Sequence, residues 1–257
     1  MEKIKWLALR GLVRGNGHWG RFPDLINKLH PEVEIEYLEL PGNGTRYMDS
    51  TPLDARIIIN DFRQKYMKSL TDSTVVKVNF IGISLGGMIG LKWLELYPDD
   101  FQNIIIINSS LKQLSSFSDR LKPNSYSYLL KAVFTKNILK REQLILKIMA
   151  NLVSPHSQEV LDNTRFSEAH PIQFQNFIRQ LILANKIKIN LNKINNRHKH
   201  EYSKPEIKII CAKKDKLVNY NCSKKIADAL KINLTVHPSA GHDIILDDPK
   251  WIIEQIF

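Results

Sequence analysis

Gly82-Ile83-Ser84-Leu85-Gly86-Gly87 is the stretch that decides the fold of this chain of 257 residues. An apolar run, Val75–Ile83, leads into it and is typical of a buried strand, while Gly86–Tyr97 is predicted to be a helix that Pro98 ends. A Gly-x-Ser-x-Gly segment between a strand and a helix is typical of a sharp turn that presents a nucleophilic serine, Ser84. The alternative is an ordinary tight turn, which also needs small residues.

A serine hydroxyl is a weak nucleophile, so it requires a base that is held in place by an acid. The candidate base is His242, which follows the last predicted strand, Ile232–Val236. The candidate acid is Asp215, which follows the strand predicted at Ile207–Ala212. Because the carboxyl ends of parallel strands meet at one edge of a sheet, Ser84, Asp215 and His242 are predicted to come together there.

Other acids compete with Asp215, for which the alternative is a solvated turn aspartate among lysines. Asp243 adjoins His242 and suits the local backbone better than it suits orienting the imidazole. Asp247 and Asp248 stand just before the last predicted helix and look like its cap. Asp215 is therefore the preferred acid.

Strand and helix signals alternate around this segment. Ile104–Ile107 consists of four isoleucines, as expected of a central strand buried on both faces. Thr51 is predicted to cap a helix that runs to about Leu70. Further elements are predicted as strands at Lys5–Leu9 and Val33–Leu40, and as helices at Phe22–Leu29, Cys222–Leu230 and Pro249–Phe257. The pattern predicts an α/β fold with a mostly parallel central sheet flanked by helices.

The alternation stops between residues 111 and 203. No convincing strand occurs there, and amphipathic helices are predicted at Tyr126–Phe134, Leu139–Leu152, Pro155–Asn163 and Pro171–Lys186. Asn195–Lys204 is predicted to be a polar linker. We therefore expect a core made of residues 1–110 and 204–257, interrupted by a helical cap (lid) insertion at 111–203.

The chain order Ser84, Asp215, His242 resembles that of the α/β-hydrolase superfamily. The chain is similar to small bacterial esterases and to the carboxylesterases of biotin synthesis, over Lys5–Ser110 and Ile207–Phe257. The resemblance implies an α/β-hydrolase fold whose cap follows the sixth strand of the family's core. That core begins with two strands that have no counterpart here, so we expect a sheet that is shorter at one edge.

The resemblance also implies roles for backbone amides. An oxyanion hole is expected from the amides of Leu12 and Leu85. Arg10-Gly11 stands where the family often has His-Gly, and Arg10 is expected to brace this loop or, less readily, to bind an anionic substrate. No metal and no cofactor is expected.

Arg14 and His18 are candidates to line the pocket over Ser84, the alternative being a solvated arginine and a capping histidine. The cap is expected to select an apolar acyl group. Its apolar positions, which equally suit docking of the cap on the core, are Tyr126, Leu129, Val133, Ile145, Met149, Phe174, Phe177 and Ile178.

The net charge of +11 is concentrated in the cap, where fifteen Lys and Arg face six Asp and Glu. Contact of this basic cap with a membrane surface is one interpretation, and a compositional bias toward Ile, Lys and Asn is the other. The sequence shows no motif of nucleic-acid binding, so we expect no nucleic-acid partner. We also expect no signal peptide and no membrane-spanning helix. Two cysteines, Cys211 and Cys222, form no disulfide framework and favour a cytoplasmic location.

These features predict a serine hydrolase of a small-molecule acyl substrate: a carboxylesterase, a lipase-like enzyme or a thioesterase. Acyl transfer, or hydrolysis of a peptide or carbon–carbon bond, uses the same three residues and stays open. A non-catalytic binding protein with the same fold is the alternative from another class. The sequence does not indicate the oligomeric state.

Overall fold

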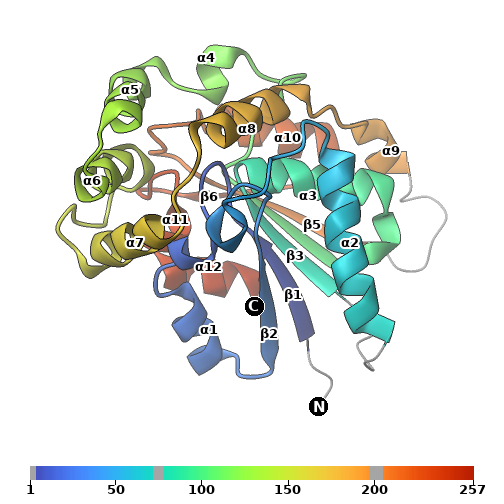
Figure 1. The fold of residues 1–257 in the computed structure, drawn as a ribbon. Coiled ribbons are helices and arrows are strands. Elements are labelled where there is room, and N and C mark those ends of the chain that lie inside the picture. The colour runs from blue at the N-terminus through green and yellow to red at the C-terminus, as the bar shows by residue number, and fades with distance from the viewer. Residues whose placement is uncertain (1–3, 72–77, 197–204) are drawn as a thin grey trace.

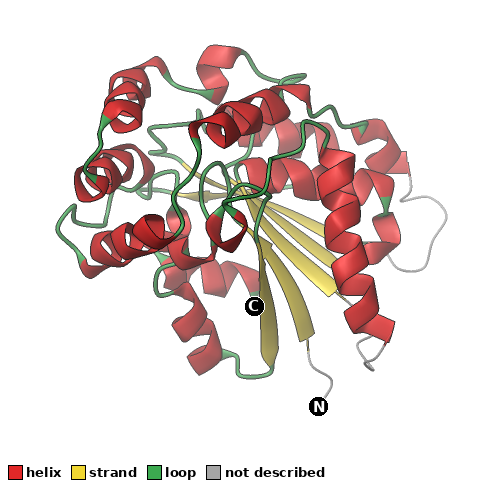
Figure 2. Cartoon of the chain, in the orientation of Figure 1, coloured by secondary structure: helices red, strands yellow, loops and turns green. Residues whose placement is uncertain are grey.

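The computed structural model describes residues 4–71, 78–196 and 205–257. One six-stranded sheet forms its centre, with every strand parallel to its neighbours in the order β2-β1-β3-β4-β5-β6 (Figures 1 and 2). The strands are β1 (Ile4–Leu9), β2 (Val33–Leu38), β3 (Val78–Ile83), β4 (Asn103–Ile107), β5 (Glu206–Ala212) and β6 (Leu234–His237). The predicted α/β class and parallel sheet are confirmed.

Strand β4 shows why the sheet is covered on both faces. Ile104 and Ile106 pack in one buried cluster, whereas Ile105 and Ile107 pack in a second one. Successive side chains of a strand point to opposite faces, so a run of isoleucines requires apolar partners on each side.

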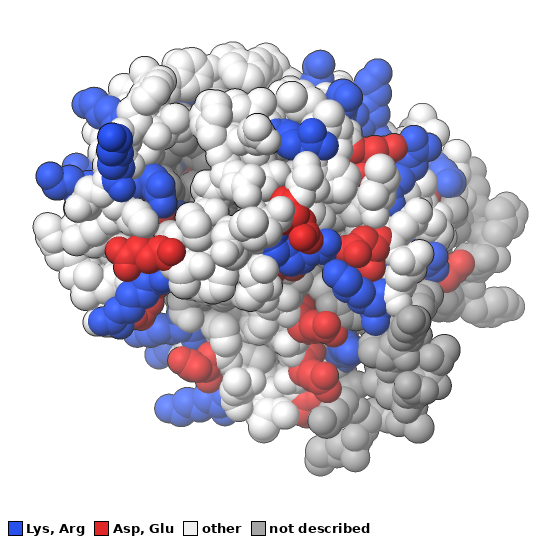
Figure 3. Space-filling view, in the orientation of Figure 1, with Lys and Arg blue, Asp and Glu red and all other residues white. Residues whose placement is uncertain are grey.

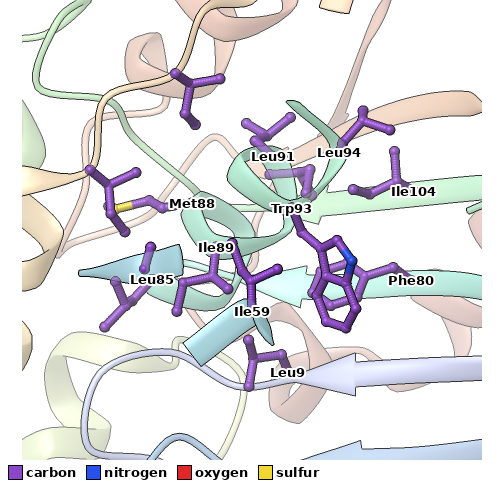
Figure 4. Close-up of a cluster of buried hydrophobic side chains, with 14 of the residues drawn as sticks. Leu9, Ile59, Phe80, Leu85, Met88, Ile89, Leu91, Trp93, Leu94 and Ile104 are labelled. Atoms are coloured by element: carbon purple, nitrogen blue, oxygen red, sulfur yellow. The ribbon is translucent and has the colours of Figure 1, made fainter. Parts of the chain in front are cut away.

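Helices supply those partners on the two faces. The first cluster contains residues of α2 (Ala55–Thr71), α3 (Leu85–Leu96) and α10 (Asn221–Leu230). The second contains residues of α1 (Phe22–Leu29), α11 (Ile244–Asp247) and α12 (Pro249–Ile256). Figure 4 shows side chains of α3, among them Ile89 and Trp93, clustered with Ile59 of α2 and with the strand residues Leu9, Phe80 and Ile104. The helix that follows Ser84 is thereby fixed by the core.

The predicted insertion is helical. Its helices are α4 (Phe117–Arg120), α5 (Tyr126–Phe134), α6 (Ile138–Met149), α7 (Gln158–Ala169), α8 (Phe174–Lys186) and α9 (Leu191–Asn196). Helices α5 to α8 lie on the side of the sheet where the strands end, whereas α9 lies beside α3 and α10 (Figure 1). Short 3-10 helices occur at Asn16–His18, Gly44–Arg46, Pro98–Asp100 and Pro123–Ser125. The division into core and cap stays a prediction, because the end of the insertion packs into the same cluster as β1, β3 and β4 through Leu183, Ile187, Ile189, Leu191 and Ile194.

Two local predictions are wrong. Thr51 does not cap α2, because its hydroxyl donates to the Pro41 carbonyl oxygen at 2.5 Å and its amide donates to the Asn176 side chain at 2.9 Å. The helix begins instead at Ala55. The predicted polar linker begins within α9, which buries Leu191 and Ile194, and its residues 197–204 lie outside the described part of the chain.

The start of the strand predicted at Val75–Ile83 also falls on residues outside the description, and β3 is described from Val78. Within residues 4–71, 78–196 and 205–257, no helix has the length and apolar character needed to cross a lipid bilayer.

Candidate active site

Ser84 stands on a strained turn between β3 and α3. Its backbone has φ 55° and ψ −115°, in the positive-φ region that residues with a side chain rarely adopt. The flanking glycines have no room for a side chain: a Cβ atom at Gly82 would lie 2.7 Å from the Gly86 carbonyl oxygen. One at Gly86 would lie 2.3 Å from the Leu9 carbonyl oxygen. Backbone strain of this kind clusters at functional sites.

The end of β4 holds this turn in place. The Ser84 amide donates to the Ile107 carbonyl oxygen at 2.9 Å. The Ser109 hydroxyl donates to the Ser84 carbonyl oxygen at 2.8 Å. The position of Ser84 is therefore set by the neighbouring strand as well as by its own helix.

Asp215 and His242 are in direct contact. Asp215 follows β5, His242 follows β6, and Oδ2 of Asp215 lies 2.7 Å from Nδ1 of His242. Both side chains are almost fully buried, at 2% and 1% exposure. The other carboxylate oxygen, Oδ1, accepts from the amides of Leu217 at 2.7 Å and Val218 at 2.9 Å. With the carboxylate fixed in this way, a proton on Nδ1 is favoured and Nε2 is left as the basic atom.

Asn108 joins the loops that carry these two residues. Its side-chain amide donates to the His242 carbonyl oxygen at 2.6 Å, and its side-chain oxygen accepts from the Ala212 amide at 2.8 Å. Its φ is 46°, a conformation that asparagine tolerates better than most residues. This role was not predicted from the sequence. The position of an asparagine at the carboxyl end of a central strand is the one feature that could have suggested it.

Ser84 and His242 line one cavity of about 210 Å³. Ser84 is half-buried. Within the described residues, no hydrogen bond joins its side chain to that of His242. The structure therefore brings Asp215 to His242 and places Ser84 at the same cavity as His242. Hydrogen bonds to a catalytic serine are often formed only when a substrate is bound.

The two amides expected to bind an oxyanion are free. In the described part of the chain, neither the Leu12 nor the Leu85 amide donates to a protein atom. Leu85 is the first residue of α3, where the helix dipole favours negative charge. The loop of Leu12 comes close to the serine, because a Cβ atom at Gly11 would lie 2.9 Å from Cβ of Ser84.

Arg10 braces this loop through a partner that the sequence did not indicate. Its guanidinium binds both carboxylate oxygens of Asp243, the residue after His242, with Nη1 2.9 Å from Oδ1. It also lies over the Trp19 ring, 5.3 Å from the centroid. The two ends of the ion pair are 233 residues apart, so no local pattern could have revealed it.

The structure places both Arg14 and His18 at the cavity. Arg14 is not solvated: its side chain is 6% exposed and Nη1 donates to Oε2 of Glu142, in α6, at 2.7 Å. The other oxygen of Glu142 accepts from the Ser167 hydroxyl, in α7, at 3.0 Å. Nδ1 of His18 accepts from the Gly15 amide at 3.1 Å, and its Nε2 lies 3.4 Å from the Ser167 hydroxyl.

Burial is the main reason why the pKa of His18 lies well below its ordinary value, and the positive charges of Arg14 and Arg10 add to the effect. His18 is therefore neutral at pH 7.

Burial also raises the pKa of the Cys211 thiol to about 12, which makes this free cysteine unreactive at neutral pH.

Apolar side chains of the predicted cap, residues 111–203, form most of the remaining wall. Of the apolar cap positions predicted from sequence, those at the cavity are Leu129, Val133, Ile145, Met149, Phe174 and Phe177. Tyr126 and Ile178 do not line it and are 39% and 37% exposed at the surface. Among the described residues, no group of three His, Cys, Asp or Glu side chains is arranged to hold a metal ion.

Comparisons with known proteins concern the family and the fold. The family model described as "alpha/beta hydrolase fold" matches residues 58–249. A search of the curated proteins found no match. Three solved structures that resemble the chain carry names of hydrolases or related proteins, and at their low sequence identities the likeness concerns the fold.

The first is a lipase-esterase related protein from Clostridium acetobutylicum, with TM-score 0.71 and 16% identity over 99% of this chain and 93% of that one. The second comes from work on carboxylesterases of the thaumarchaeon Nitrososphaera gargenis, with TM-score 0.70 and 18% identity over 99% and 88% of the two chains. The third is a meta-cleavage product hydrolase from Pseudomonas fluorescens, with TM-score 0.72 and 16% identity over 99% and 89%.

Proposed function

Because the chain belongs to the α/β-hydrolase fold family, we propose that it is a serine hydrolase that cleaves an ester or thioester bond of a small acyl substrate. A carboxylesterase, a lipase-like enzyme and a thioesterase all fit this description. The observation that carries the proposal is the 2.7 Å contact between Asp215 and His242 at the cavity that Ser84 lines. The names of the similar structures, which include a lipase-esterase related protein and a carboxylesterase, support it.

In the first half of the reaction, the Ser84 hydroxyl attacks the acyl carbonyl carbon while Nε2 of His242 takes its proton. The carbonyl oxygen becomes an oxyanion, which the amides of Leu12 and Leu85 stabilise. The carbonyl re-forms, the bond to the leaving alcohol or thiol breaks, and His242 gives that group the proton. Asp215 keeps the imidazole oriented and stabilises its charged form.

In the second half, water attacks the acyl-serine and gives its proton to His242. The tetrahedral intermediate collapses, the carboxylic acid leaves, and Ser84 recovers its proton. The strained turn at Ser84 keeps the hydroxyl exposed to the cavity through both steps.

A fluorescent fluorophosphonate probe, which forms a covalent bond with an activated serine, tests the proposal. We expect the purified protein to be labelled and labelling to be lost in Ser84→Ala and His242→Ala. Matched controls are Ser127→Ala and His156→Ala, two exposed positions in the cap that lie outside the cavity, where labelling is expected to persist.

A folded protein that neither reacts with the probe nor hydrolyses short p-nitrophenyl esters would refute a catalytic role. That result would favour a binding protein with this fold. Labelling without ester or thioester hydrolysis would favour another reaction of the same three residues, such as acyl transfer or hydrolysis of a carbon–carbon bond.

A further inference from the structure

The cavity holds three guanidinium groups, and they differ in how their charge is balanced. Arg10 is paired with Asp243, and Arg14 is paired with Glu142. Arg141, on α6 beside Glu142, lines the same cavity, and its side chain forms no ion pair or hydrogen bond with any described residue. Asp243 and Glu142 therefore balance two of the three guanidinium groups, and Arg141 has no carboxylate partner among the described residues.

Arg14 contributes hydrogen-bond donors to this part of the cavity. One of its nitrogens, Nη1, donates to Glu142, and no acceptor among the described residues meets Nε or Nη2. The side chain as a whole is 6% exposed, but neither of these two nitrogens is among the fully buried polar atoms without a partner, so both reach the accessible space of the cavity. These donors therefore suit an acceptor that enters the cavity.

The carboxylate of Glu142 is occupied within the wall. Oε2 accepts from Arg14 and Oε1 accepts from the Ser167 hydroxyl, so each carboxylate oxygen already has a hydrogen-bond donor from the protein. Arg14 and Arg141 line the same cavity, so a ligand inside it can meet both the donors of Arg14 and the unpaired charge of Arg141. Figure 3 shows the surface hollowed between α5, α6 and α8, with Lys and Arg side chains at the rim.

We propose that Arg14 and Arg141 bind an anionic oxygen group of the substrate. The natural substrate is then an ester or thioester that carries a carboxylate or a phosphate in addition to the bond that is cleaved. Guanidinium groups match the planar, multiple acceptors of these anions. The apolar wall formed by Leu129, Ile145 and Phe177 would contact the carbon chain between the two ends. This inference rests on the proposed hydrolase function and names its substrate class.

Matched esters test the inference. A neutral p-nitrophenyl acyl ester is compared with one of equal length whose acyl chain ends in a carboxylate, and with one whose carboxylate lies on the leaving alcohol. A fourth ester carries a phosphate on the leaving alcohol. The quantity measured is the ratio of kcat/KM for each anionic ester to that for the neutral ester with the same leaving group, in the wild type, in Arg141→Gln and in the control Lys140→Gln. Lys140 is the exposed neighbour of Arg141 on α6 and does not line the cavity. Its substitution by glutamine removes the same charge as Arg141→Gln.

We expect at least one anionic ester to be preferred by the wild type by about tenfold, the effect of one charge-assisted hydrogen bond. The preferred ester identifies the anion and the half of the substrate that carries it. Arg141→Gln should abolish the preference mainly through a higher KM, and Lys140→Gln should retain it. A wild type without any such preference, or a preference that survives in Arg141→Gln, would overturn the inference.

Calorimetric binding of free adipate to Ser84→Ala separates this inference from the proposed function, because it needs no nucleophile. Binding that is lost in Ser84→Ala/Arg141→Gln but kept in Ser84→Ala/Lys140→Gln supports the anion site even if no ester is hydrolysed. Absence of adipate binding together with a lack of ester preference refutes the anion site. The hydrolase proposal then still stands if the fluorophosphonate probe labels Ser84.

Discussion

Arg10 and Asp243 form an ion pair that joins the loop after β1 to the loop after β6. Each side chain is 2% exposed, and the guanidinium meets both carboxylate oxygens. Leu12 follows Arg10 by two residues, and His242 directly precedes Asp243. A single buried contact therefore fixes the proposed oxyanion amide and the proposed base relative to one another.

Replacing Arg10 by methionine leaves the Asp243 carboxylate buried without its partner. We expect Arg10→Met to lower the free energy of unfolding by about 3 to 5 kcal/mol, the usual effect of breaking a buried pair. Urea denaturation followed by circular dichroism measures it. The double variant Arg10→Met/Asp243→Leu is the control and should recover most of the loss, because no buried charge remains. A loss below about 1 kcal/mol in the single variant would contradict the prediction.

Asp215 should matter for rate far more than for folding. In Asp215→Asn the side chain no longer favours a proton on Nδ1 of His242, so kcat for an ester substrate should fall by about 10⁴-fold. Steady-state kinetics on folded protein measures the effect. Asp248→Asn is the matched control: Asp248 caps α12 by accepting from the Trp251 amide, asparagine caps a helix about as well, and kcat should change little. Equal losses of kcat in the two variants would exclude Asp215 as the acid.

The positive φ of Ser84 predicts a gain in stability when the strain is removed. Glycine adopts φ 55° without the steric cost that a Cβ atom imposes, whereas alanine keeps that cost. Ser84→Gly should therefore be more stable than Ser84→Ala by about 1 kcal/mol. Thermal unfolding of the two inactive variants compares them directly, and a less stable glycine variant would show that the turn is not strained.

Asn108 is expected to be a positioning residue. Asn108→Ala removes the hydrogen bonds to the His242 carbonyl oxygen and the Ala212 amide, so kcat/KM should fall on the order of tenfold to a hundredfold through misplacement of the base. The control is Asn103→Ala, at the opposite end of β4, where the side chain donates to Asn79. If both variants lose the same activity, the effect comes from general destabilisation of β4.

The lowered pKa of His18 predicts how stability depends on pH. Below about pH 6.5 the unfolded chain takes up a proton on this residue, while the folded chain keeps it neutral until the lower folded pKa is reached. Proton uptake by the unfolded state favours unfolding, so stability falls as the pH falls through this window. As the pH falls through this window, the free energy of unfolding of His18→Asn should decrease by up to about 1.4 kcal/mol less per pH unit than that of the wild type. Denaturation at pH 7.0, 6.0 and 5.0 tests this, and parallel curves would contradict it.

The fold could be predicted from the sequence because its elements carry local signals. Alternation of apolar strands with amphipathic helices predicted all six strands of the described sheet. The glycines on either side of Ser84 predicted its turn. The contact between Asp215 and His242 could be predicted because both residues follow strands whose carboxyl ends share an edge. Where only local signals were used, tertiary contacts could override them, as at Thr51, whose capping pattern gave way to hydrogen bonds with Pro41 and Asn176.

The charged partners at the site could not be predicted in the same way. Arg10 and Asp243 are 233 residues apart, and Arg14 and Glu142 are 128 residues apart. A chain with 37 basic and 26 acidic residues offers many such pairs, and nothing local selects the correct ones. Only the packing of the cap and of the loops against the sheet determines which charges meet.

The register of β4 against β5 has a consequence for synthesis on the ribosome. Asn103 pairs with Glu206, so the isoleucine-rich edge of β4 has no partner until about a hundred more residues have been made. At typical rates of translation this interval lasts on the order of 5 to 20 s, during which a sticky, unpaired edge is open to wrong partners. The nascent chain is thus most vulnerable to aggregation while the cap is being translated, and we expect chaperones that bind apolar segments to act in that window.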